Sequence, residues 1–264
     1  MENEIKKHNC LRNLLRISVL FLLTSFPAFI NAQDAATLAK DGDSLYRIGN
    51  YADAIDKYEA ALTTGRGSAD LYYNLGNAYY RENQNARAIL NYERALRLRP
   101  GMTDARENLA LANERTQDRI TELPQWFMAR WWNAMTTKVS PTTWRIVWLV
   151  LLALVAAAVV CLRIGRGTTL RRWSLLVGLL ALIMLVAATV ILYKATMNFN
   201  SHSSAVVMDE SVAVKSSPEA RSADKIILHE GTRVTINESL QGWEKITIAD
   251  GTSGWCPTEA VERI

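Results

Sequence analysis

The residue types that most often carry chemistry are few in this chain and lie far apart. Among its 264 residues, three are histidines and three are cysteines. Neither set has the close spacing of a metal site or a disulfide framework, so we expect no metal and no cofactor. Nucleophile, phosphate-loop and zinc-protease motifs are absent, and acids such as Asp53 and Asp56 have the helical spacing of a solvated face. The sequence therefore predicts a protein that is not an enzyme.

The most concentrated charge is an arginine cluster between two apolar stretches. Arg163, Arg166, Arg171 and Arg172 lie close together, and no acid balances them. Such a cluster could bind nucleic acid, bind lipid headgroups, or mark one side of a membrane. The net charge of the chain is only +4 and no nucleic-acid reading module is present, so we expect no nucleic-acid partner.

The two apolar stretches, 144–164 and 173–194, are predicted to be transmembrane helices. At 1.5 Å rise per residue each reaches roughly 30 Å, the thickness of a hydrocarbon core. A buried helical hairpin of a soluble protein is the alternative, and two such long runs with a short connection disfavour it. Because short basic loops stay in the cytoplasm, the loop 165–172, with Arg163 beside it, is predicted to be cytoplasmic. Both flanking soluble regions would then lie on the opposite side.

Residues 1–32 have the basic, apolar and small-residue parts of a secretory signal peptide, with Ala32 before the expected cleavage site. An uncleaved anchor is the alternative, and in either case the chain from residue 33 onward is exported. The Trp-rich segment 121–143 favours a helix at the membrane interface over a packed linker. A second linker is expected over 195–204.

A repeat with a period of about 34 residues occupies residues 33–120. It relates Gly42 to Gly76 and Tyr58 to Tyr92. The pattern resembles the tetratricopeptide repeat, in which small residues let paired helices approach and tyrosines fill the gaps between them. The expected units are 35–68, 69–102 and a capping helix over 103–118.

By similarity to that family, the repeats present a concave face that binds peptides or protein segments. Asparagine side chains on this face can hydrogen-bond a bound backbone, and tyrosines offer stacking area. The alternative is that these side chains are simply solvated. Where family members clamp a C-terminal carboxylate with basic residues, this chain has Ala39, Asp104 and Asn108, which argues against binding of chaperone tails. The candidate binding residues are Asp43, Tyr46, Arg47, Tyr73, Asn74, Asn77, Tyr80, Arg81 and Asn108.

Residues 205–264 change to short strand-like runs separated by turns such as Gln241-Gly242, which predicts a small β-barrel. The order of strands, glycines and tryptophans resembles a bacterial SH3 domain, and such domains bind cell-wall peptides or protein segments. We expect Trp255 to be in the core. Trp243 is expected to be partly core and partly a binding residue, and it joins the candidate sites.

The predicted fold class is a multidomain membrane protein: an all-α tetratricopeptide array, a two-helix transmembrane hairpin and an all-β SH3-like barrel. This order of parts resembles E-type proteins of the Bat (aerotolerance operon) family of Gram-negative bacteria. The resemblance implies an inner-membrane protein with both soluble domains in the periplasm. Its implied partners are other Bat-family membrane proteins, including ones with von Willebrand A-type domains. The expected function is a scaffold in aerotolerance or envelope stress. The alternative is a peptidoglycan-binding sensor acting through the SH3 domain.

Overall fold

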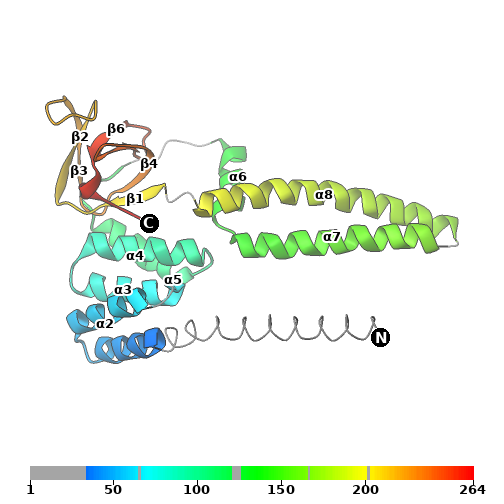
Figure 1. The fold of residues 1–264 in the computed structure, drawn as a ribbon, viewed down its shortest axis with the longest axis horizontal. Helices are drawn as coiled ribbons and strands as arrows, with labels where there is room; N and C mark the ends of the chain where they lie inside the picture. Colours follow the sequence, from blue (N-terminus) through cyan, green and yellow to red (C-terminus); the bar gives the residue numbers. More distant parts are fainter. Residues whose placement is uncertain (1–33, 65–66, 121–125, 166, 201–202) are drawn as a thin grey trace, which may run out of the picture. The chain divides into compact units, whose positions relative to one another are not determined.

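The computed structural model describes residues 34–264, except 65–66, 121–125, 166 and 201–202. The predicted signal peptide therefore lies outside the described residues. The chain divides into two compact units, Met1–Asn83 and Gln84–Ile264, whose helices and strands are labelled in Figure 1.

The first unit is built from consecutive helices: a helix over 34–47, α2 (Tyr51–Thr64) and α3 (Ala69–Arg81). Alanine, leucine and tyrosine recur at helical spacing on the buried faces of α2 and α3, as amphipathic helices require. The turn before α2 requires a glycine, because Gly49 has a φ of +83° there. Ser68 caps α3 by accepting a hydrogen bond from a backbone amide in the first turn, at 3.1 Å.

The second unit begins with α4 (Asn85–Leu98) and α5 (Thr103–Glu114), which pack against each other. The Asn85 side-chain amide donates a hydrogen bond to the Ala112 carbonyl at 3.1 Å and ties the start of α4 to the end of α5. Helix α5 ends before residue 118, the end expected for the capping helix. Alanines without exposed surface allow the close packing: Ala88, Ala95, Ala105 and Ala112.

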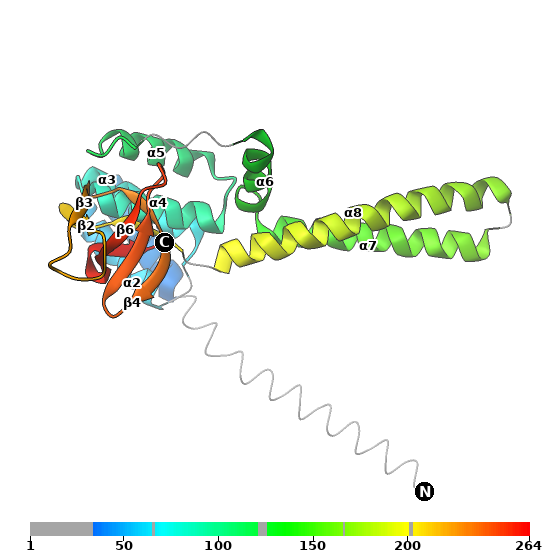
Figure 2. The same ribbon diagram turned by 90° about the horizontal axis from the view of Figure 1, so that it is seen from above.

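A short helix, α6 (Phe127–Thr137), precedes two long apolar helices, α7 (Pro141–Ile164) and α8 (Thr168–Asn200). Helices α7 and α8 pack side by side as a hairpin (Figures 1 and 2). Helix α8 extends into the loop predicted for 165–172 and into the linker predicted for 195–204. The prediction followed the apolar residues, which show only the part of a helix that can lie in the bilayer core. Polar residues can continue the same helix at both ends.

The outer surface of this hairpin is apolar. Both helices are long and apolar enough to cross a membrane, and only 6% of the most apolar stretch of α7 and 17% of that of α8 is buried. Such open faces are unlike those of a core helix in a soluble domain. Between the helices, the Trp148 indole donates a hydrogen bond to the Thr189 hydroxyl at 3.0 Å. A Cβ added at Gly178 would meet the Ala158 Cβ at 3.0 Å, so small residues bring the two backbones close together.

The C-terminal part of the second unit is an antiparallel sheet with strand order β3-β2-β6-β5-β4-β1-β7. Buried and less buried residues alternate along the strands, and the buried ones form one core that includes Val207, Leu228 and Ile246. The tight turn between β4 and β5 was predicted from Gln241-Gly242, and both residues have positive φ angles, 46° and 86°. The elements are β1 (Ser204–Val207), β2 (Ser211–Lys215), β3 (Asp224–His229), β4 (Arg233–Leu240), β5 (Trp243–Thr247), β6 (Ser253–Pro257), a 3₁₀ turn (Thr258–Ala260) and β7 (Val261–Arg263).

The expectation that Trp255 is in the core of this sheet is wrong. Gly254 and Cys256 are the buried residues of β6, and the alternation of the strand therefore turns Trp255 to the outer face. There the Lys245 ammonium lies 5.8 Å from the centre of the Trp255 ring. A side chain at position 254 would meet Val214 at 2.5 Å, so glycine allows β2 to approach β6.

Within the second unit, the segment that follows α5 joins the helices to the sheet. Asp118 accepts hydrogen bonds from the backbone amide of His229 and the hydroxyl of Thr232, each at 2.7 Å, and pairs with the His229 ring at 2.7 Å. These hydrogen bonds to the carboxylate, His229 included, hold the pKa of Asp118 below its usual 3.8 although burial acts in the opposite direction. From α4, Glu93 pairs with Arg233 at 3.2 Å. The sheet and helices α4 and α5 are thus one packed body.

Candidate protein-interaction site

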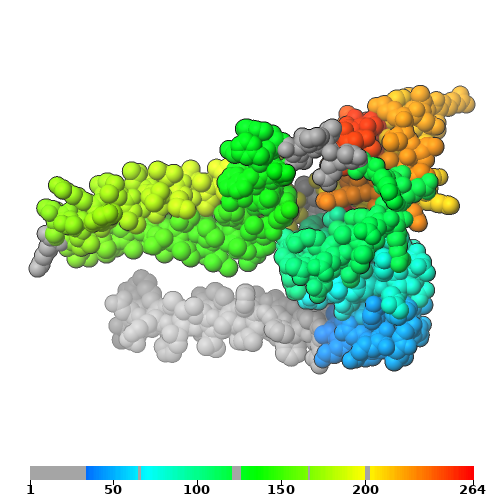
Figure 3. Space-filling model, turned by 180° about the vertical axis from the view of Figure 1, so that it is seen from behind, coloured from blue at the N-terminus to red at the C-terminus, as the bar shows by residue number. Residues whose placement is uncertain are grey.

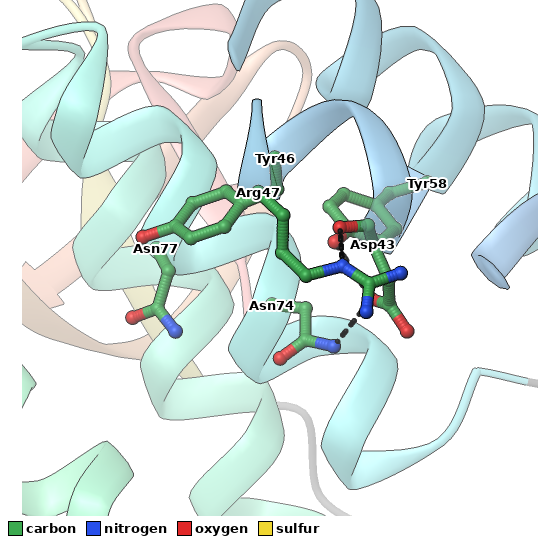
Figure 4. Close-up of a pocket in the computed structure, with 6 residues that line it drawn as sticks. All are labelled: Asp43, Tyr46, Arg47, Tyr58, Asn74 and Asn77. Carbon is green, nitrogen blue, oxygen red and sulfur yellow. Dashed lines mark hydrogen bonds between the residues drawn. The ribbon is translucent and has the colours of Figure 1, made fainter. Parts of the chain in front are cut away.

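A cavity of 320 Å³ opens in the first unit between the helix over 34–47, α2 and α3 (Figure 4). It is too small to enclose a folded partner, but it is large enough for one or two side chains of a bound segment. Its lining residues come from all three helices and are Asp43, Tyr46, Arg47, Tyr58, Asn74 and Asn77.

The Asp43 carboxylate organises this cavity. Its Oδ1 accepts a hydrogen bond from the Tyr58 hydroxyl at 2.8 Å and another from the Asn74 side-chain amide at 3.0 Å. Burial, together with the hydrogen bond to Asp43, raises the pKa of Tyr58 well above its usual 10.0, so its hydroxyl stays a donor. A Cβ at Gly42 would lie 2.6 Å from the Tyr58 ring, so glycine is needed for this ring to reach Asp43.

Arg47 supplies the positive charge of the cavity. Its Nε donates to the Asp43 backbone carbonyl at 3.2 Å, and one terminal nitrogen donates to the Ser44 hydroxyl at 3.2 Å. The side chain is exposed, and Figure 4 shows its guanidinium group in front of the Asp43 side chain. A guanidinium has five N–H donors, so it can still donate to a carbonyl or carboxylate of a bound segment.

An aromatic cluster borders the cavity at Tyr46. The rings of Tyr46 and Tyr51 meet edge to face with centroids 5.1 Å apart, and the Arg81 guanidinium lies 4.8 Å from the centre of the Tyr51 ring. Burial is the main cause that raises the pKa of Tyr46, and the nearby Tyr73 adds to it. The cluster adds aromatic surface next to the polar cavity.

The structure brings together five of the candidate residues in the cavity: Asp43, Tyr46, Arg47, Asn74 and Asn77. Tyr73 and Arg81 lie near Tyr46 at the aromatic border, and Tyr80 is half-buried on α3 outside the cavity lining. Asn108 belongs to α5 of the second unit.

Sequence reasoning missed Tyr58 and Tyr51 as site residues. Tyr58 was assigned to packing because it repeats at Tyr92, and its ring is indeed 1% exposed. Its hydroxyl donates to Asp43 in the cavity lining, and this contact follows from the packing of two helices. The 34-residue pattern therefore predicts the packing of the Tyr58 ring, but it does not predict the hydrogen bond made by the Tyr58 hydroxyl.

A second groove, of 690 Å³, lies in the sheet domain and includes Trp243. Trp243 stands opposite Pro257 in the β5–β6 ladder, and Leu240, 43% exposed, adds an apolar side chain. At the groove floor the buried Glu244 accepts hydrogen bonds from Arg263 at 2.9 Å and from a serine hydroxyl at 2.6 Å. The groove thus combines an aromatic wall with a fully paired buried charge.

The described residues contain no group of three His, Cys, Asp or Glu side chains that could hold a metal ion. Burial raises the pKa of the Cys256 thiol to about 12, so this cysteine is protonated at neutral pH and is a poor nucleophile. The chemistry that these sites offer is hydrogen bonding, charge pairing and aromatic contact, which is the chemistry of recognition.

Paired amphipathic helices with a polar and aromatic cavity define a helical-repeat array, an architecture whose surfaces generally bind protein segments. The comparison with protein families agrees: residues 40–102 and 73–122 match the tetratricopeptide repeat family. Repeats of this family are generally non-enzymatic protein-interaction domains, which agrees with the recognition chemistry of the cavity. No curated protein matches the chain.

Proposed function

We propose that this protein is a membrane-anchored scaffold of a Bat-type aerotolerance and envelope-stress system, and that its repeat cavity binds a segment of a partner protein. The observation that carries the proposal is the cavity around Asp43, in a segment that matches tetratricopeptide repeats. Three helices converge there on one polar network and leave donors and an aromatic surface at the opening.

The cavity would recognise a bound segment first through hydrogen bonds to the main chain of that segment. Asn74 and Asn77 place side-chain amides along one face of α3, where an extended segment could exchange hydrogen bonds with them. Arg47 would pair with a carbonyl or acidic side chain, and Tyr46 would pack against an apolar one. Because the Asp43 carboxylate accepts two hydrogen bonds, it would hold the surrounding side chains in a fixed position for binding.

Anchoring would be supplied by α7 and α8. A hairpin returns the chain to the side from which it entered, so the repeats and the sheet domain would share one compartment. The basic residues around 163–172 favour a cytoplasmic tip, and the predicted signal peptide favours export of the residues after it. Both soluble parts would then lie in the periplasm at the inner membrane.

The Bat assignment is supported by the order of parts, and by the likeness of the sheet domain to a bacterial SH3 domain. The expected partners are other Bat-family membrane proteins, including those with von Willebrand A-type domains. Affinity capture of the full chain from detergent should recover such proteins, and the pair of substitutions Asn74→Ala and Asn77→Ala should reduce their recovery. Capture of lipid alone, or equal recovery with the altered cavity, would contradict the proposal. Lys57, exposed on α2 and away from the cavity lining, provides a control as Lys57→Ala.

A second candidate function, a peptidoglycan-binding sensor, is favoured by the groove at Trp243. An aromatic wall beside paired charges suits a cell-wall peptide. Purified sacculi should then retain the full chain, and Trp243→Ala should abolish retention. Trp255→Ala is the matched control, because Trp255 is a half-buried tryptophan of the same sheet that does not line the groove. Equal retention of both variants, or none of the unaltered chain, would remove this candidate.

A further inference from the structure

Helix α6 exposes an unusual number of large apolar side chains for its length. The exposed fractions are 60% for Phe127, 47% for Met128 and 57% for Trp131, and Trp126 just before the helix is 69% exposed. At 100° per residue, Phe127, Met128 and Trp131 lie on one side of the helix. Only Thr136, on the other side, is buried. A short soluble helix would normally turn this apolar stripe toward a core.

The position of α6 restricts which occupants could cover that stripe. Helix α6 packs against α8, and the Trp144 indole in the first turn of α7 donates a hydrogen bond to the Met135 carbonyl at 3.0 Å. Figures 1 and 2 both show α6 beside the end of the hairpin where α7 begins, running across the long axis of the hairpin. The space-filling view shows it open on the face drawn (Figure 3). If the hairpin crosses a bilayer, a helix in this position lies along the bilayer surface.

The charges of this region have one sign. No aspartate or glutamate occurs between Leu123 and Met208, whereas Arg130 and Lys138 lie on or next to α6 and Arg145 in the second turn of α7. A protein-facing surface usually mixes both signs, while a surface that meets anionic headgroups is enriched in basic residues. The combination of exposed aromatic rings, basic side chains and no acid matches an interfacial helix.

We propose that α6 lies on the membrane surface, on the side where α7 enters, with Phe127, Met128 and Trp131 in the interface and its basic neighbours on anionic phospholipid headgroups. The proposal rests on the membrane anchoring proposed above. A helix held in this way fixes the point at which the chain leaves the bilayer. A protein partner on the same stripe is the competing occupant, and spin labelling distinguishes the two.

The test uses nitroxide labels on the full chain in phospholipid vesicles. In a parent chain with Cys10→Ser and Cys161→Ser, the remaining cysteine, Cys256, is buried and provides the unlabelled background. Single cysteines are then introduced as Phe127→Cys and Trp131→Cys, and collisions with oxygen, which is lipid-soluble, are compared with collisions with a water-soluble nickel complex.

Labels at two control positions, one on α6 and one on α7, separate failure of the membrane anchoring from failure of the surface helix. Asn133 lies about 200° around α6 from Trp131, and Leu149 is an exposed residue of α7. We expect the labels at 127, 131 and 149 to favour oxygen several-fold over the label at 133. If 149 favours the nickel complex, the hairpin is not in the bilayer and the proposed anchoring fails. If 149 favours oxygen but 127 and 131 favour nickel, the anchoring stands and the surface helix is wrong, which leaves the stripe to a protein.

A second measurement tests whether the basic residues near α6 contact anionic phospholipid headgroups. Oxygen accessibility at 127 and 131 should be higher in vesicles with phosphatidylglycerol than in vesicles of phosphatidylcholine alone. The difference should shrink in about 1 M salt, where the screening length falls to about 3 Å. Equal accessibility in both lipids would overturn the assignment of anionic headgroups.

Discussion

Replacing Asp118 by asparagine should loosen the attachment of the sheet domain to α5. In the native chain the carboxylate faces three donor groups at 2.7 Å: the His229 amide, the His229 ring and the Thr232 hydroxyl. The asparagine side chain would be nearly the same size. It would lack the negative charge, and it would turn an N–H group toward one of these partners. That bond would be lost, or, at the His229 ring, kept only as a weaker neutral bond with the ring in its other tautomer.

The size of the effect can be estimated from these contacts. A hydrogen bond to a charged group contributes about 1.5–3 kcal/mol. The three bonds share one carboxylate and are not additive, and because the Asp118 side chain is 14% exposed, water can replace part of the lost bonding. We therefore expect Asp118→Asn to lower the free energy of local opening by about 2 kcal/mol, which is roughly a 30-fold change in the opening equilibrium.

Native-state hydrogen exchange measures this opening directly. The His229 amide donates to Asp118, so its exchange should become roughly 30-fold faster in the variant. Asp209→Asn, at an exposed position between β1 and β2 of the same domain, is the matched control and should leave the rate unchanged. Unchanged exchange in Asp118→Asn, or equal acceleration in both variants, would refute the assigned role of the carboxylate.

Gly42, Glu93 and Asp118 are three positions where one change, of residue or of pH, should have a defined result. Gly42→Ala should destabilise the first unit by about 1–3 kcal/mol in thermal unfolding, because the new Cβ would meet the Tyr58 ring at 2.6 Å and that ring is fully buried. Glu93→Gln should leave stability at pH 8 unchanged or raise it. Burial raises the pKa of Glu93 above its usual 4.5, and Arg233 only partly offsets this, so the stability contributed by the protonated form is lost as the pH rises through the folded-state pKa. Thermal unfolding at several pH values should show this slope in the unaltered chain and not in the variant. Conversely, the lowered pKa of Asp118 means that its contribution is present above pH 3.8 and is lost as the pH falls further, so amides held by it should exchange faster, relative to their intrinsic rates, only in that acidic range.

Features set by local pattern were predictable from the sequence. The Gln241-Gly242 turn needs two residues that tolerate positive φ, and the short strands on either side alternate as expected. The small residue at Gly42 and the tyrosine at Tyr58 were both visible in the 34-residue period. Such features depend on neighbours in the chain or on one helix period, which a sequence displays directly.

Features that depend on distant segments were not predictable. The Asp118 contacts join positions more than a hundred residues apart, and no local pattern marks them. Trp255 was expected in the core, whereas the alternation of β6 places Cys256 on the inner face and Trp255 on the outer one. The cavity was predicted in part. Its lining residues on the helix over 34–47 and on α3 were expected, but the hydroxyl of Tyr58, on α2, was not.

We propose that the cavity around Asp43 binds a protein partner at the membrane. Photocrosslinking in cells tests it most directly, with a photoreactive residue at Asn77 in the cavity and, as the control, at Asp56 on the exposed face of α2. We predict one adduct from position 77 that is absent from position 56 and contains a membrane protein of the Bat type. No adduct from position 77, or the same adducts from both positions, would contradict the claim.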